Sequence, residues 1–288
     1  MRTSLIAKGF GSLLLLIAPA SPQSAQLSSR AGETYEITQS YKTSEEASDG
    51  SSGSSSGSYT IRERILTERD GGFEIEYDLP PQSTANDRAD NWQLPARVLK
   101  IPGRSMQLLN ADQLERRLGD WLKAAKWDRS VCGRWIFTWN AFRIDCDPHS
   151  IIERVDIMNL DAQDLHEGAA YKDPQAIGLA HLARNVSASN GTTLRVTASV
   201  DPEKIKRQRA VNDVAVGEIS QKPVSLESAL RARSGEQVSG SISVVWEIDE
   251  TGSARKRTKT TTVEIRRPDG ITEKRMSTDI VERRQILQ

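Results

Sequence analysis

This sequence of 288 residues is poor in the residue types from which most catalytic and metal sites are built. It holds two cysteines and three histidines, and aromatic residues make up 5% of it. It has no phosphate-binding loop, no dinucleotide-binding fingerprint and no H-E-x-x-H zinc motif. The run G-S-S-S-G at 53–57 fits the nucleophile-elbow expression, but no apolar strand precedes it and no helical pattern follows it. These absences favour a non-catalytic protein, and the sequence predicts no cofactor.

Long hydrophobic runs are missing as well, apart from one at the N-terminus. Arg2 and Lys8 accompany an apolar run at 13–17, and A-P-A at 18–20 fits the small-x-small cleavage rule. We therefore expect residues 1–20 to be a cleaved signal peptide. No later stretch approaches the roughly 18 apolar residues of a transmembrane helix. The expected mature protein is soluble, without a transmembrane segment, and exported to the periplasm or medium.

Charge of one sign is not in excess, because 39 Lys+Arg stand against 39 Asp+Glu. Such a balance argues against nucleic-acid binding. The segment 253–288 is more basic, with ten Lys or Arg and five Asp or Glu. It could form a basic surface for a partner such as an envelope protein. Solvated sides of strands with mixed charges are the simpler interpretation.

The two cysteines predict one disulfide, because cysteines in exported chains are usually paired. Cys132 and Cys146 are not in the C-x-x-C spacing of redox-active pairs. Such a bridge needs Gly133 to bend the chain, since glycine tolerates conformations that other residues avoid.

Between the cysteines lies the segment richest in aromatic residues, which predicts a hairpin at 133–147. With a turn at 140–141, Trp135 lies opposite Cys146 on an apolar face, and Arg134 lies opposite Asp147 on a polar face. We expect this hairpin to be the centre of a core.

The patterns along the chain predict an α+β fold that is mainly antiparallel β-sheet. Alternating apolar residues at 35–41, 59–79 and 242–283 indicate strands, with Asp-Gly turns between several of them. The clearest helix is amphipathic and covers 111–125. The Ser/Gly run at 43–58 is typical of a low-complexity loop.

These elements suggest two β-rich parts joined by a helix–hairpin–helix centre. We expect a disordered mature N-terminus at 21–32, a β-rich domain at 33–185 and a β-meander domain at 186–288. Asp-Pro at the start of 173–185 predicts a helix there. Alternating valines predict a strand at 214–219. A duplication of one part stays open.

Two sets of side chains are candidate sites. Tryptophans Trp121, Trp127, Trp135 and Trp139 could line a cavity for an apolar small molecule, although the general behaviour of aromatic side chains favours packing in the core. The alternation of Asp145, Asp147 and His149 makes a weak candidate for a metal site.

Three functional hypotheses follow from these patterns. The first is a non-catalytic binding module, periplasmic or envelope-associated, with an apolar small molecule as its ligand. The second is a protein-interaction component whose C-terminal meander supplies a strand-pairing or basic surface. The third is a hydrolase of unrecognised type, because a Ser-His-Asp triad has no fixed sequence spacing.

Overall fold

The computed structural model describes residues 31–137, 141–162, 164–186 and 191–286. Strands of the main sheet are β1 Thr34–Ala47, β2 Ser52–Arg69, β3 Gly72–Asp78, β4 Ala96–Lys100, β5 Gln107–Leu108, β10 Ala183–Val186, β11 Thr192–Ser199, β12 Gln237–Ile248, β13 Ala254–Arg266 and β14 Thr272–Gln285. Two small hairpins consist of β6 Trp135–Phe137 with β7 Ala141–Arg143, and β8 Ala170–Tyr171 with β9 Ala180–His181. The helices are α1 Ala85–Asp90, α2 Ala111–Ala124, α3 Ser150–Ile157, α4 Pro202–Ile219 and α5 Leu226–Ala232.

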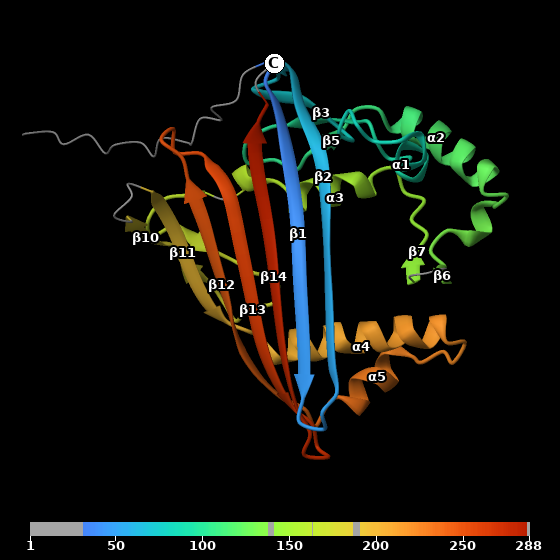
Figure 1. The fold of residues 1–288 in the computed structure, drawn as a ribbon, viewed down its shortest axis with the longest axis vertical. Helices are drawn as coiled ribbons and strands as arrows, with labels where there is room; N and C mark the ends of the chain where they lie inside the picture. The colour runs from blue at the N-terminus through green and yellow to red at the C-terminus, as the bar shows by residue number, and fades with distance from the viewer. Residues whose placement is uncertain (1–30, 138–140, 163, 187–190, 287–288) are drawn as a thin grey trace, which may run out of the picture.

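Ten strands form one antiparallel sheet in the order β10-β11-β12-β13-β14-β1-β2-β3-β4-β5. The helices gather on one side of this sheet, with α4 and α5 near one end and α1, α2 and α3 near the other (Figure 1). The predicted α+β class with mainly antiparallel sheet is confirmed at this level.

The sheet joins the beginning and the end of the described chain. Strand β1 pairs with β14 on one side and with β2 on the other, from Tyr35 opposite Gln285 to Ala47 opposite Glu273. Strands from both predicted β-rich parts, 33–185 and 186–288, therefore belong to a single sheet. The strands of the C-terminal meander lie inside it and are paired on both sides within the chain.

Alternation along the strands gives the sheet a covered face and an open face. On the covered, helix-bearing face lie buried apolar side chains from strands far apart in the sequence: Ile37, Ile61, Ile65, Ile75, Val196, Ile242, Val244, Trp246, Ile265 and Val281. The intervening residues, such as Lys42, Thr262 and Lys274, are exposed on the other face. The predicted helix at 111–125 is confirmed as α2, which buries Leu114, Leu118 and Leu122.

The prediction of a loop at 43–58 is wrong. Thr43–Ala47 ends β1, and β2 begins at Ser52 and runs through the Ser/Gly segment paired to β1 without interruption. Serine and glycine have low strand propensity, but the neighbouring strand supplies the backbone hydrogen bonds that decide the conformation.

Two predictions around α4 are also wrong. The expected helix at 173–185 is a loop followed by short strands, and the expected strand at 214–219 is the end of α4. Asp173 does not cap a helix; its buried carboxylate accepts a hydrogen bond from Lys259 Nζ at 2.6 Å. Asp201 is the residue that caps a helix, because its Oδ1 accepts the backbone N–H of Glu203 at 3.1 Å.

The predicted disulfide is present, but the hairpin around it has another register. Cys132 and Cys146 are bonded, with their Cα atoms 5.5 Å apart, and Gly133 between the strand and the bridge has a φ of +77°. Trp135 pairs with Arg143 and not with Cys146. The bridge lies beyond these paired residues, where the chain turns: the N–H of Arg134 donates to the carbonyl of Val131, and that of Gly133 to the carbonyl of Ile144. The positive φ of Gly133 is the bend that the predicted bridge requires.

The predicted pair of Arg134 and Asp147 does not form in this register. Asp147 instead lies 3.4 Å from the ring of His149, and the carbonyl of Arg134 accepts the N–H of Ile144. The turn expected at 140–141 borders 138–140, which lie outside the described residues. Across the parts of the chain that the structure describes, no helix is both long and apolar enough to cross a membrane.

Candidate functional site

The covered face of the sheet changes character along the four strands β13, β14, β1 and β2. Near one end the face is apolar, with Ile37 opposite Ile61. Further along, four hydroxyl side chains lie directly opposite one another across these strands: Thr261, Ser277, Thr43 and Ser55. Since registered strands lie about 4.8 Å apart, these hydroxyls form a row across the sheet.

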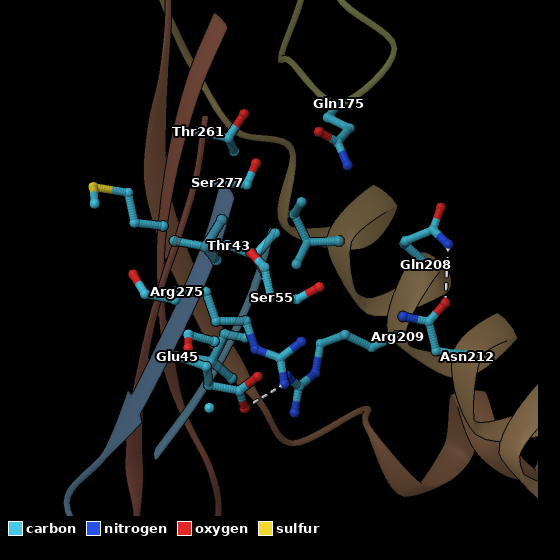
Figure 2. A pocket seen from close by; sticks show the side chains of 17 residues that line it. Thr43, Glu45, Ser55, Gln175, Gln208, Arg209, Asn212, Thr261, Arg275 and Ser277 are labelled. Atoms are coloured by element: carbon cyan, nitrogen blue, oxygen red, sulfur yellow. Dashed lines mark hydrogen bonds and ion pairs between the residues drawn. The ribbon is translucent and has the colours of Figure 1, made fainter. Parts of the chain in front are cut away.

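Helix α4 faces this row from the other side of a pocket (Figure 2). The pocket has a volume of about 450 Å³. Ile205 and Asn212 of α4 line it, with Gln175 from the loop before β9, and Val263 and Ile265 add apolar surface on the sheet side. Hydroxyl and amide groups thus meet aliphatic side chains within one cavity.

Small residues of the Ser/Gly segment keep this space open. Gly53 and Ser55 of β2 line the pocket. Gly57, the next residue on the covered face, lies against the ring of Tyr41, and a Cβ there would be 2.6 Å from the nearest ring atom. Side chains of ordinary size at Gly53 and Ser55 would fill the space between β2 and α4, whereas at Gly57 the ring of Tyr41 already occupies the space above the backbone.

An ionic network closes one end of the pocket. Arg209 of α4 is buried and bonds to Glu273 at 2.8 Å and to Glu236 at 3.2 Å. Arg275 bonds to Glu45 at 2.8 Å and to Glu273 at 3.2 Å. These contacts connect α4 to β14 and β1 and leave both guanidinium groups at the pocket wall (Figure 2).

Glu273 is the centre of this network. Its burial alone would raise the pKa of the carboxyl group, but the hydrogen bonds and charge of Arg209, aided by Arg275 and Arg267, lower the pKa below its ordinary value. The group therefore stays ionised beside the pocket at neutral pH and compensates the buried charge of Arg209.

The lining groups offer hydrogen bonds and apolar contact. Thr43 Oγ1 donates to the backbone carbonyl of Ser55 at 3.4 Å, so its oxygen can still accept a bond from a ligand. No histidine or cysteine is among the described residues that line the pocket, so its hydroxyls have no imidazole base beside them. The arrangement can orient an amphiphilic molecule.

None of the tryptophans that the sequence singles out lines this pocket. Trp121 and Trp127 pack edge to face, with ring centroids 5.6 Å apart, against the core beneath α2. Trp135 lies in β6 and is partly buried, and Trp139 lies outside the described residues. An apolar cavity lined by these rings stays a prediction.

The weak metal candidate has an exposed geometry. Asp147 and His149 have side chains 66% and 63% exposed, and Asp145 uses a carboxylate oxygen to accept the backbone N–H of Asp147. Within the described ranges, no group of three or more His, Cys, Asp or Glu side chains is placed to hold a metal ion.

Sequence reasoning missed the pocket because its residues come from segments that look unrelated. The available signal was parity: Thr43 in β1, Ser55 in β2 and Ser277 in β14 each continue the phase of buried residues further along their own strand. Recognising that phase requires the Ser/Gly segment to be read as a strand.

Half of the basic residues in 253–288 turn towards the covered face. Arg257 donates to the backbone carbonyl of Ile157, and Arg283 to Glu63. Lys259, Arg267 and Arg275 are also bonded to carboxylates. These side chains form bonds within the fold. Only part of the basic residues in this segment can therefore contribute to a surface that binds a partner.

Comparison with known proteins identifies no family for this chain. No protein family matches the sequence, and no curated protein is significantly similar to it. A solved structure of lipid–protein interactions in lipovitellin aligns with a TM-score of 0.41 and 9% sequence identity. The alignment covers 90% of this chain and 26% of the lipovitellin chain, so this chain spans about a quarter of that protein's length.

Proposed function

We propose that this protein is a non-catalytic binding module and that the pocket between α4 and the sheet holds a small amphiphilic molecule. The observation that carries the proposal is the row of Thr43, Ser55, Thr261 and Ser277 facing aliphatic residues across a cavity. A volume of about 450 Å³ is suited to a ligand of drug-like size.

The lining suggests how such a molecule lies. Its apolar part contacts Ile205, Val263 and Ile265, where burial of apolar surface supplies the attraction. Its polar group reaches the hydroxyls of Thr43 and Ser277, which fix its orientation. A wholly apolar ligand would leave these hydroxyls without water or a partner, which is unfavourable.

Filling the pocket tests this proposal. Ser277→Phe places a ring on the covered face of β14, inside the cavity, and Thr278→Phe places the same ring on the opposite face of the same strand. Protein purified from its own source is examined by native mass spectrometry. We expect a retained small-molecule mass on the wild type and on Thr278→Phe, and at least a tenfold smaller retained fraction on Ser277→Phe. Equal retention by the two variants would place the ligand elsewhere.

We also propose that the chain works in an exported location, periplasmic or secreted. The disulfide between Cys132 and Cys146 supports this, because such bonds persist in oxidising compartments. Intact mass of the protein from its source should correspond to a chain that begins after Ala20 and is two hydrogens lighter than its reduced form. A chain that keeps residues 1–20 and has free thiols would contradict export.

A further inference from the structure

Strand β2 is longer than the strand that follows it in the sheet, and the difference leaves an open edge. Pairing with β3 begins only at Arg62, opposite Asp78. After Asp78 the chain turns away through Pro80 and Pro81, which cannot donate to a ladder. Below Arg62, β2 is paired on its β1 side alone.

The backbone groups at this edge alternate in direction. Ile65 donates its N–H to the carbonyl of Glu33 at 3.0 Å, so odd-numbered residues of β2 point their N–H and C=O towards β1. Even-numbered residues point the other way, and Arg62 and Arg64 meet β3 in that direction. No described strand pairs with this side of β2 below Arg62, so the N–H and C=O groups of the serines in the same phase are open to a new strand: Ser52, Ser54, Ser56 and Ser58.

This edge lacks the features by which proteins prevent strand pairing. Such features are lysines, prolines, bulges or covering elements. Residues 50–61 contain no charged side chain and no proline, in a chain of which 27% is charged. Pairing between β1 and β2 is regular throughout this stretch, and Ser52, Ser54, Ser56 and Ser58 are exposed.

We propose that the open edge of β2 between Ser52 and Ser58 binds an extended segment of a partner protein, which adds as a strand antiparallel to β2 in line with β3. The segment pairs with the free groups of Ser54 and Ser56. Its alternate side chains face the covered side of the sheet, where the small residues Gly53 and Ser55 leave room beside the pocket. The matching segment is uncharged or apolar at these inward positions, because the neighbouring stretch of β2 carries no charge.

The edge can be tested separately from the small-molecule site, although Gly53 and Ser55 border both. Ser56 has its side chain on the open face, and changing it leaves the side chains of the pocket in place. Ser277, in turn, lies two strands away from the edge. Failure of one proposal therefore leaves the other standing.

A peptide with the sequence of β3, Gly72–Leu79, is the probe, because it already has the alternation that β2 pairs with in the folded chain. We expect the fluorescein-labelled peptide to bind the full chain saturably by anisotropy. Ser56→Pro removes one edge-facing N–H and no bond to β1, and should weaken binding at least tenfold. Ser56→Thr keeps the N–H and should bind like the wild type.

A second pair of peptides makes the test independent of how well Ser56→Pro folds. Methylation of the backbone nitrogens that correspond to Glu74 and Glu76 blocks the side of the peptide that faces β2. This methylated peptide should lose at least tenfold in affinity for the wild type. The proposal is overturned if the wild type binds the methylated and unmethylated peptides with equal affinity. It is also overturned if Ser56→Pro binds the peptide as tightly as the wild type does, or if the wild type does not bind it. A wild-type dimer that Ser56→Pro converts to a monomer would also overturn it, in favour of self-pairing.

Discussion

At the scale of single residues, the most consequential group is the carboxylate of Glu273. It accepts bonds from Arg209 and Arg275, and Arg267 lies 3.5 Å away. A buried ion pair is weak evidence for net stability, but removal of one partner leaves a buried charge without compensation. Glu273 therefore holds α4 against the sheet at the closed end of the pocket.

We predict that Glu273→Gln destabilises the protein by about 3 kcal/mol at pH 7, the order found when one partner of a buried pair is removed. Glu264→Gln, on the exposed face of β13, should change stability by less than about 0.5 kcal/mol. Urea unfolding followed by tryptophan fluorescence measures both.

The same group sets part of the dependence of stability on pH. Because the pKa of Glu273 is lowered in the folded state, its contribution is complete above the pKa of the unfolded chain and disappears as pH falls through the folded value. The gap between wild type and Glu273→Gln should therefore narrow below about pH 4.5, the ordinary range of a glutamate. A gap that stays constant down to pH 3 would contradict this role.

At the scale of elements, the sequence predicts those helices and strands whose conformation is determined by the pattern of their own residues. Helix α2 is specified by its own amphipathic spacing, and the β12–β14 meander by alternation and turn residues. The Asp70-Gly71 turn between β2 and β3 is also as expected, since both residues have positive φ. Such elements need no knowledge of their neighbours.

Elements that depend on distant partners escape prediction. The Ser/Gly part of β2 is a strand because β1 lies beside it, and α4 is a helix although Val214 and Val216 alternate like a strand. The predicted hairpin register is wrong because it assumes a turn at 140–141, whereas Phe137 of β6 pairs with Ala141 of β7. The pocket cannot be predicted when β2 and α4 are mispredicted, since these two elements form its walls.

At the scale of the whole molecule, the continuous sheet argues for one cooperative unit. β14 lies opposite β1 over thirteen residue positions, and β1 lies opposite β2 over another thirteen. Partial unfolding of either predicted part would expose the edge of these long central strands.

We predict a single transition in scanning calorimetry, with a calorimetric enthalpy equal to the van't Hoff enthalpy within error. The disulfide between Cys132 and Cys146 should be intact during the scan, because reduction would change the unfolded state. Two separable transitions would show that residues 33–185 and 186–288 fold independently.

The central claim is that the space between α4 and the hydroxyl row is a binding site. Its most direct test is a crystal structure of the protein that retains its natural small molecule after purification. We predict electron density between Ile205 of α4 and Ser277 of β14, with a polar atom within hydrogen-bond distance of Thr43 or Ser277. An empty pocket, with the retained molecule bound at Trp121 and Trp127 instead, would contradict the account.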